Sequence, residues 1–237
     1  MRLTLPANKF AAAWLNVTKA TTNDEPNPAL ASICLEAISD NEVRLVATDG
    51  YWLLRSYVEA GADLSDDPGL DITGDTILAS DTEGRMTNLM KWVHKVSKPR
   101  GDDPPLITQL ELTVTSGEVD DRPTLDSTLD RQVLVVDTDH EKVRIPIVEH
   151  TYPNWRALTD QTAEGLDMCA LSLQRLGRLG TVRNAVGHAE LTFNGPLKPV
   201  GLHVPGDPNL DGLIMPVRVD HSGDVTVLRT GAGDMRG

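Results

Sequence analysis

The residue types best suited to catalysis gather in one short stretch, Asp137-Thr138-Asp139-His140. Two carboxylates and an imidazole this close together could act as a general acid and base, or as ligands of a metal ion. The stretch falls between two predicted strands, however, and Asp is also a common turn residue because its side chain bonds its own backbone. The turn is the favoured interpretation, and a hydrolase is the most distant of the functions we weigh.

The other reactive side chains form no recognisable constellation. His94, His150, His188 and His203 have no fixed spacing to one another or to the two cysteines, Cys34 and Cys169. Glycine-rich loops of the kind that cradle phosphates are also missing from the sequence. We therefore predict no enzymatic activity, no cofactor and no metal site, so that any ATP-driven step has to come from a partner.

Charge is distributed unevenly along the 237-residue chain, whose net charge is −13. Three predicted helical windows, 7–20, 83–100 and 172–186, hold ten Lys and Arg but only one acid, Glu83. The rest of the chain holds 12 basic and 34 acidic residues. Helices that merely tolerate Lys and Arg should also carry Glu. The asymmetry therefore predicts a basic helical face on an acidic body, a field that steers polyanions to one side.

Hydrophobic periodicity predicts the elements that carry these residues. Leu15 falls outside the apolar stripe of the first helix and is predicted to be exposed. Ser80 and Glu83 are spaced as a capping box for the second helix. Ser172 is expected to cap the third helix, with Leu173 and Leu176 on one face and Arg175 and Arg178 on the other. Gly177 and Gly180 make that helix either weak or closely packed. Strands are expected at 2–5, 30–38, 43–48, 53–58, 76–79, 106–115, 133–136, 143–148, 166–171, 189–193, 200–204 and 213–219.

This order repeats three times as a β-α-β-β-β unit, which predicts an α+β fold with helices on one side and antiparallel sheets on the other. Two units make a complete domain over residues 1–160, and the third makes a half domain over 161–219. Residues 220–237 are expected to form a flexible tail. The third unit lacks a partner, and another copy of the chain is the simplest one.

The most distinctive motif is Ala47-Thr48-Asp49-Gly50-Tyr51-Trp52-Leu53. Asp-Gly between alternating apolar residues predicts a hairpin turn. Trp52 follows the turn, either as a lid on the core or as one wall of a groove. Two further motifs lie downstream, Thr151-Tyr152-Pro153-Asn154-Trp155-Arg156-Ala157-Leu158 and Ile214-Met215-Pro216-Val217-Arg218-Val219.

Together these motifs, in this order, resemble the middle domain, linker and chain end of the bacterial DNA sliding clamp, the β subunit of DNA polymerase III. The repeated unit is also similar to the clamp's building block, and the resemblance covers most of residues 1–219. Two departures stand out: a first domain and half of a third have no counterpart here, and Trp52 replaces the usual Arg. Clamp rings are lined by twelve such units, so four copies of this chain would supply the same number.

The resemblance implies a hydrophobic groove that binds peptides of partner proteins. Its walls would be Leu30, Thr48, Gly50, Tyr51, Trp52, Leu53, Pro153, Ala157, Leu158, Met215, Pro216, Val217 and Arg218. Met and aliphatic side chains can adapt to an incoming Leu or Phe. For Leu30 and Leu53, an ordinary place in the core is equally compatible with the sequence.

The resemblance also implies that the basic helices face DNA. The candidate phosphate contacts are Lys9, Lys19, Arg85, Lys91, Lys95, Lys98, Arg100, Arg175, Arg178 and Arg183. Such contacts attract the DNA backbone without reading bases.

The sequence thus predicts a polymerase processivity factor: a homo-oligomeric ring, with a tetramer favoured, that encircles double-stranded DNA. Its partners would be a DNA polymerase, other clamp-binding proteins and a clamp loader. The alternative is a clamp-like module that binds such peptides without encircling DNA, as an adaptor or competitor.

We expect the protein in the cytoplasm, at the nucleoid. The start of the chain is too short and polar for a signal peptide, no apolar run approaches a membrane span, and two isolated thiols suit a reducing compartment.

Overall fold

A computed structural model of the chain describes residues 2–22, 27–39, 42–59, 76–81, 83–99, 103–116, 132–159, 169–182, 188–195, 197–219 and 225–227. Its strands are β1 (Arg2–Pro6), β2 (Ser32–Ser39), β3 (Glu42–Thr48), β4 (Trp52–Glu59), β5 (Thr76–Ser80), β6 (Gln109–Ser116), β7 (Gln132–Asp137), β8 (Lys142–Pro146), β9 (Glu190–Thr192), β10 (Val200–His203), β11 (Leu210–Ile214), β12 (Val217–Val219) and β13 (Val225–Val227). The helices are α1 (Ala7–Val17), α2 (Arg85–Val96), α3 (Arg156–Thr159) and α4 (Leu173–Leu179), with a 3₁₀ turn, η1 (Thr18–Ala20), after α1.

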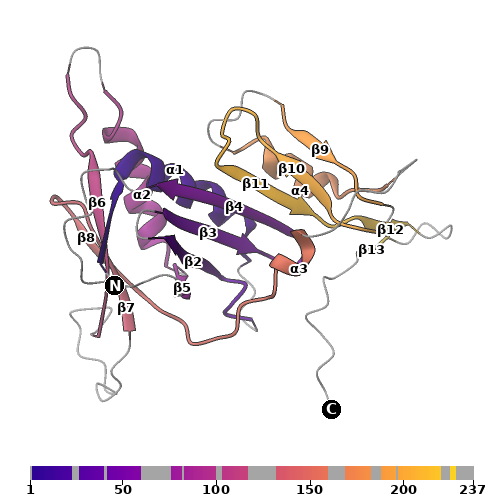
Figure 1. The fold of residues 1–237 in the computed structure, drawn as a ribbon, viewed down its shortest axis with the longest axis horizontal. Coiled ribbons are helices and arrows are strands. Elements are labelled where there is room, and N and C mark those ends of the chain that lie inside the picture. Colours follow the sequence, from indigo (N-terminus) through magenta and orange to yellow (C-terminus); the bar gives the residue numbers. More distant parts are fainter. Residues whose placement is uncertain are drawn as a thin grey trace.

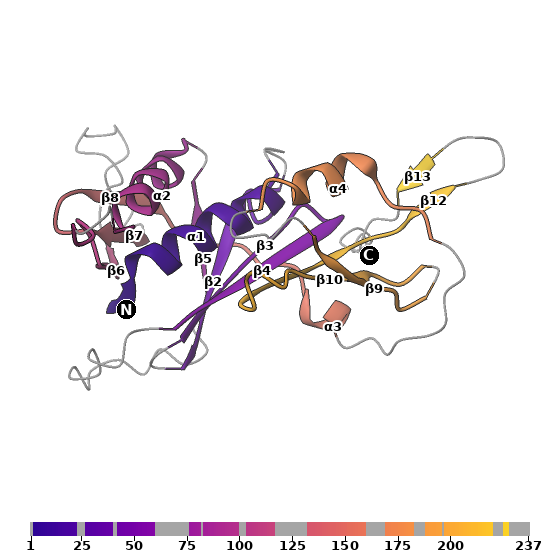
Figure 2. The ribbon, with the colours of Figure 1, turned by 90° about the horizontal axis from the view of Figure 1, so that it is seen from above.

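Antiparallel sheets form one layer of the molecule and three of the helices form the other, as predicted. One sheet has the strand order β1-β6-β7-β8, the second has the order β5-β2-β3-β4-β11-β10-β9, and β12 pairs with β13. Figures 1 and 2 show α1, α2 and α4 on one side of the seven-stranded sheet and the short α3 on the other. We call these sides the helix face and the outer face.

The first two units interlock into one body with a shared core. β1 pairs with β6 and β5 pairs with β2, so each unit contributes one strand to the other unit's sheet. Alternate residues of the sheets, such as Leu35, Leu45 and Leu112, are buried in the same core cluster as Phe10 and Trp14 of α1. The period-2 and helical patterns read from the sequence therefore meet in a single core.

The third unit is joined to this body through a continuous sheet. β11 pairs antiparallel with β4, with Gly212 opposite Leu54. A Cβ atom added to Gly212 would lie 2.3 Å from the carbonyl oxygen of Leu53, so only a residue without a side chain allows the two strands to pair here. The Arg55 guanidinium also reaches across the junction to the Asp211 carboxylate, with Nη2 2.7 Å from Oδ2.

Two details of the first body differ from the sequence prediction. Leu15 is buried, with 6% of its surface exposed, because α2 lies beside α1 and covers the flank that periodicity left open. The predicted Ser80–Glu83 capping box is also wrong. The Asp81 carboxylate accepts hydrogen bonds from the backbone N–H groups of Met86 and Thr87, at 2.9 and 2.7 Å, and Glu83 pairs with Arg85 instead.

The third helix is only loosely packed. Leu173 is 83% exposed, and α4 contains no buried residue, although Leu176 and Leu179 pack against the edge of the core. Ser172 stands at the N-cap, but its side chain makes no capping hydrogen bond. A Cβ atom at Gly177 would meet nothing within 4 Å, so this glycine does not serve a close approach. Of the two alternatives, the weak helix is the one that the structure supports.

The chain's ends and loops are described only in part. Residues 117–131 and the first half of the predicted strand at 166–171 lie outside the described residues. Val225–Val227 of the predicted tail form β13 against β12. Within the described part of the chain, no helix is long and apolar enough to cross a membrane.

Candidate functional site

The turn between β3 and β4 is built as its sequence predicts. Gly50 has φ +84°, a conformation that glycine adopts without strain. Asp49 Oδ1 accepts hydrogen bonds from the N–H groups of Tyr51 and Trp52, at 2.9 and 3.1 Å. The Thr48 hydroxyl donates to the carbonyl of Trp52 at 2.7 Å and accepts from the N–H of Gly50. These bonds fix the start of β4, where the predicted groove begins.

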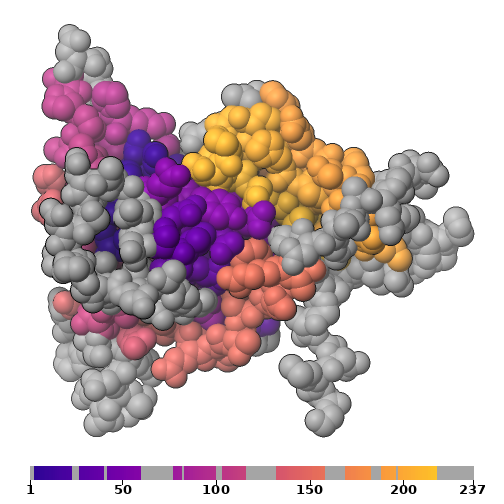
Figure 3. Space-filling model, viewed as in Figure 1, coloured from indigo at the N-terminus to yellow at the C-terminus, as the bar shows by residue number. Residues whose placement is uncertain are grey.

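The three segments of the predicted groove meet at the junction of β4 and β11. The N–H of Met215 donates to the Tyr51 carbonyl at 2.8 Å, which ties the chain end to the hairpin turn. The Tyr152 hydroxyl of the linker donates to the Val46 carbonyl at 3.3 Å. Burial raises the pKa of Tyr152 well above its ordinary value, so the phenol keeps its proton for this bond. Figure 3 shows the linker in salmon between the first body and the third unit.

An apolar cluster occupies the outer face at this junction. Its members, which we call the outer-face cluster, share the face of the sheet opposite α1: Ala29, Cys34, Val46, Leu53, Leu78, Trp155 and Leu213, with Val148 and Tyr152 packed against them. Leu53 is 2% exposed, Leu213 9% and Trp155 2%. Burial raises the pKa of the Cys34 thiol, and the carboxylate of Glu36 beside it adds to the shift, which keeps the thiol protonated.

The linker is held onto this cluster by charged groups. The centroid of the Trp155 ring lies 4.9 Å from the guanidinium carbon of Arg44 and 4.8 Å from that of Arg156. Both arginines pair at 2.9 Å with the carboxylate of Glu36, which is 5% exposed. An ion pair at a nearly buried carboxylate, combined with stacking on an aromatic face, holds a segment more firmly than an exposed pair would.

The predicted groove residues divide between the two faces of the sheet. Leu53 joins the outer-face cluster, whereas Trp52 is 1% exposed and belongs to the helix-face core. This alternation follows from the period of the strand, because neighbouring residues point to opposite faces. The sequence left open whether Trp52 is a core lid or a groove wall, and the structure places it in the core.

The remaining groove residues surround the junction at different depths. Met215 and Pro216 are buried, Leu30, Tyr51, Pro153 and Val217 are half-buried, and Ala157 is exposed. Leu158 lies in α3 and Arg218 in β12, but their side chains lie outside the described ones. Sequence reasoning missed Trp155 and Leu213 as members of this surface, although Trp155 stood within the linker motif and Leu213 one residue before the chain-end motif.

On the helix face, the basic side chains of α2 point to solvent. Lys91 and Lys95 of α2 and Lys98, just past its end, are exposed and recur at i, i+4 and i+7, and within the described residues they make no ion pair. We call these three residues the lysine stripe of α2. Lys9 of α1 is exposed as well, while Arg85 pairs with Glu83 at 2.7 Å. Arg100 and Arg183 lie outside the described residues. The stripe on α2 is therefore the clearest anion-attracting surface that the structure brings together.

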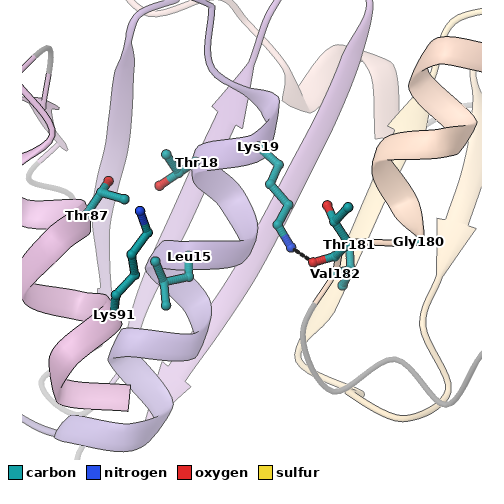
Figure 4. Close-up of a pocket in the computed structure, with 8 residues that line it drawn as sticks. All are labelled: Leu15, Thr18, Lys19, Thr87, Lys91, Gly180, Thr181 and Val182. Carbon is teal, nitrogen blue, oxygen red and sulfur yellow. Dashed lines mark hydrogen bonds between the residues drawn. The ribbon is translucent and has the colours of Figure 1, made fainter. Parts of the chain in front are cut away.

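A pocket of about 450 Å³ lies on the same face, between α1, α2 and the end of α4 (Figure 4). It is lined by Leu15, Thr18, Lys19, Thr87, Lys91, Gly180, Thr181 and Val182. Lys19 donates to the Thr181 carbonyl and so bridges the first body and the third unit (Figure 4). The ammonium groups of Lys19 and Lys91 suit a phosphate of a nucleic-acid backbone. The hydroxyls of Thr18, Thr87 and Thr181 already donate to Trp14, Asp81 and Arg178.

The basic residues of α4 are placed differently. The Arg175 guanidinium lies over the Tyr51 ring, 4.3 Å from its centroid, and its Nε is 3.9 Å from Asp49 Oδ2. Arg178 Nη1 lies 3.8 Å from the same oxygen. These two arginines bind the β3–β4 turn, at the junction between the first body and the third unit.

The acid- and histidine-containing stretch forms a hairpin turn between β7 and β8. Asp137 Oδ1 accepts from the N–H of Asp139, whose φ is +63°, and Asp137 pairs with Lys142 at 2.6 Å. The hydrogen bond from Lys142 lowers the pKa of the Asp137 carboxyl. His140 packs edge-on against Trp92, 6.5 Å between ring centroids. The described residues hold no cluster of three metal-ligating side chains.

Comparison with known proteins agrees with this architecture. No family model and no curated protein matches the sequence. Among solved structures, the chain is similar to the DNA polymerase III β subunit of Thermotoga maritima, with a TM-score of 0.66 and 13% identity over 93% of this chain and 66% of that one. It is also similar to the sliding clamps of Caulobacter crescentus (TM-score 0.63, 12% identity, 92% of this chain) and Bacillus subtilis (0.62, 10%, 93%), covering 65% of each.

The chain thus spans about two thirds of the length of these proteins. At identities of 10–13%, the similarity lies in the arrangement of helices and strands and not in the side chains. The repeated unit, the continuous sheet across the junction and the helices on one face all agree with it. The chain has the fold of the bacterial DNA sliding clamp.

Proposed function

We propose that this protein is a non-catalytic DNA sliding clamp that tethers a polymerase and other replication proteins to double-stranded DNA. The observation that carries the proposal is the lysine stripe of α2, which lies on the helix face of a clamp fold with a net charge of −13. Exposed Lys side chains on helices attract phosphates without sequence preference. A ring of several copies, with a tetramer favoured, would place these stripes around the duplex and let the protein slide.

The outer face supports the second half of the proposal. Leu53, Leu213 and Met215 lie where the linker, β4 and β11 meet, and each is 9% exposed or less. A partner peptide with an apolar anchor residue would enter here if the linker at Pro153 shifts aside, since the linker covers the cluster. The groove residues that sequence analysis named on this face are thus proposed to bind clamp-interacting peptides, at the cost of displacing part of the linker.

The decisive experiment is retention on closed DNA. Protein is dissociated by dilution, reconcentrated with nicked circular plasmid, and separated from free protein by gel filtration at 0.3 M salt. A ring stays with the circle and is released when a restriction enzyme cuts it, because only topology holds it at that salt. Equal release from circular and linear DNA would contradict encirclement.

The retention assay, combined with a peptide-binding measurement, distinguishes the sliding clamp from the alternative, a clamp-like adaptor. A clamp-like adaptor would bind a fluorescent clamp-interacting peptide with an apolar anchor, yet remain monomeric and leave circular DNA untouched. The observation that favours this second candidate is the tight closure of the outer-face cluster by Trp155, which suits a regulated peptide site.

A further inference from the structure

The first body is held together by three contacts between its two units. β1 of the first unit pairs with β6 of the second, and β5 of the second pairs with β2 of the first, both antiparallel. The helices α1 and α2 lie side by side above them, where the Trp14 indole donates to the Thr87 hydroxyl at 3.4 Å. Each unit therefore offers its partner one receiving strand, one donated strand and one helix.

The third unit repeats the geometry of the second. Ala79 of β5 forms an antiparallel bridge with Ile147, which directly follows β8, and Ala170 forms the same kind of bridge with Val217, which follows β11. Cys169–Leu171 thus corresponds to β5, α4 to α2, and β9 to β6. In the first body, β5, α2 and β6 pack against β2, α1 and β1 of the other unit. Among the described residues, the third unit has no such partner elements.

The third unit leaves exposed the surfaces whose counterparts are buried in the first body. Within the described residues, β9 pairs with β10 alone and forms the outer edge of the seven-stranded sheet (Figure 1). Four large apolar side chains are exposed in the described part of the chain, and three of them, Leu173, Phe193 and Leu197, belong to this smaller unit. Leu173 begins α4 and Phe193 follows β9. An unpaired strand edge beside exposed apolar side chains is a template for association.

We propose that two copies of this chain associate through their third units, about a two-fold axis, to complete one clamp-like domain. β9 of each copy receives Cys169–Leu171 of the other as an antiparallel strand, and the two α4 helices pack side by side as α1 and α2 do. Both copies offer the same donor and the same acceptor, so the contact closes on itself and leaves no further edge of this kind.

This interface deepens the proposed function, and its place in a ring rests on that function. A dimer joined in this way carries two complete domains and one composite domain. At each end of such a dimer lies the edge strand β8. β8 is the last strand of the second unit, just as β4 is the last strand of the first. Since β4 pairs antiparallel with β11, two β8 edges from two dimers can meet in the same way, which gives a tetramer of twelve units.

The test compares two exposed leucines. Leu173→Glu places a carboxylate at the start of α4, where it favours the helix and where the two copies would bring like charges together. Leu106→Glu changes a leucine that is 58% exposed and lies in the first body, away from the proposed contact. Masses of the full chain and both variants are measured by light scattering from 1 to 100 μM, with circular dichroism to confirm that each is folded.

We expect the unchanged chain and Leu106→Glu to form dimers or multiples of dimers, and Leu173→Glu to dissociate with a constant at least about tenfold higher. Hydrogen exchange adds a local measurement: the amides of 190–193 should become protected as the concentration rises, and those of Leu173→Glu should not. A monomeric unchanged chain at 100 μM, or an oligomer that Leu173→Glu leaves intact, would overturn the interface. A dimer that Leu173→Glu disrupts, but that never stays on circular DNA, would keep the interface and reject the ring.

Discussion

Helix α2 packs beside α1, buries Met86, Met90 and Val93, and turns Lys91 and Lys95 to solvent. Helix α4 buries none of its residues and holds Arg175 and Arg178 against the turn at Asp49. The two helices follow equivalent strands of a repeated unit, so the difference arises from their surroundings. A helix fixed by apolar packing can leave its cations free for a ligand, whereas a weakly packed helix uses them to stay in place.

The same contrast extends to the units that carry these helices. The first body is held by interlocked strands and one core, while the third unit is joined to it by the β4–β11 pairing, Arg55–Asp211, Lys19–Thr181 and the Asp49 turn. Substitutions at Gly212, in the lysine stripe, at Arg175 and at Gly177 test whether packing holds the first body and charged contacts hold the third unit.

Gly212→Ala should separate the stabilities of the two regions. The added methyl would lie 2.3 Å from the Leu53 carbonyl oxygen and 2.9 Å from the Leu54 side chain, so the strands must move apart. We expect a loss of about 3 kcal/mol in the stability of the third unit. Hydrogen exchange should show faster opening of β9–β11 and unchanged protection of β6 and β7. Equal loss in both regions would mean that they unfold as one unit and that the comparison fails.

The triple change of Lys91, Lys95 and Lys98 to Glu should abolish most DNA binding and leave folding intact. Three phosphate contacts at 0.1 M salt are worth about 100-fold in affinity, or about 2.7 kcal/mol. Binding to a 30-base-pair duplex is measured by fluorescence anisotropy over a range of salt concentrations. The slope of log K against log salt should fall by about 2–3.

A single-residue pair controls that experiment for net charge. Lys95→Glu lies in the lysine stripe. Lys142→Glu makes the same change of charge on β8, where the Lys142 ammonium pairs with the Asp137 carboxylate at 2.6 Å. Only Lys95→Glu should weaken DNA binding. If both variants lose equal affinity, the net charge of the protein matters and the position on α2 does not.

The contrast between α2 and α4 also shows which features of the fold could be predicted from the sequence. Alternation and helical periodicity predicted β3, β4, α1 and α2 correctly because each buries a regular apolar face. Leu15 was placed wrongly because α2 lies beside α1, and the exposure of Leu173 was left open. The neighbours of a helix are tertiary facts that no local pattern contains.

The roles of the charged residues were harder still to predict from the sequence. Arg175 and Lys91 have the same appearance in the sequence, as cations opposite an apolar stripe, yet the structure ties Arg175 to Tyr51 and Asp49, which lie more than a hundred residues earlier. Of the buried members of the outer-face cluster, Leu53 alone was among the groove residues that the resemblance implied. The period of the strand explains why Leu53 belongs to the cluster and Trp52 does not. Trp155 could have been found by asking which large ring of the linker would cover the sheet.

Arg175→Gln should weaken the attachment of α4. It removes a cation that is 14% exposed and stacked on Tyr51, which costs about 1 kcal/mol, while Arg178→Gln, at 42% exposure, should cost less than about 0.5 kcal/mol. Urea unfolding with hydrogen exchange at α4 measures both. If Arg175→Gln instead lowers DNA affinity with no change in stability, α4 serves DNA as α2 does and the two helices are alike.

Gly177→Ala should have the smallest effect, and in the opposite direction. The position is exposed within α4 and an added Cβ meets nothing within 4 Å, so alanine removes the entropic disadvantage of glycine and stabilises the helix by up to about 1 kcal/mol. The gain should appear as slower exchange of the α4 amides at a concentration where the chain is monomeric. A loss that develops only as the concentration rises would place a second α4 against Gly177, because a methyl group that is harmless in one copy would then obstruct the packing of two.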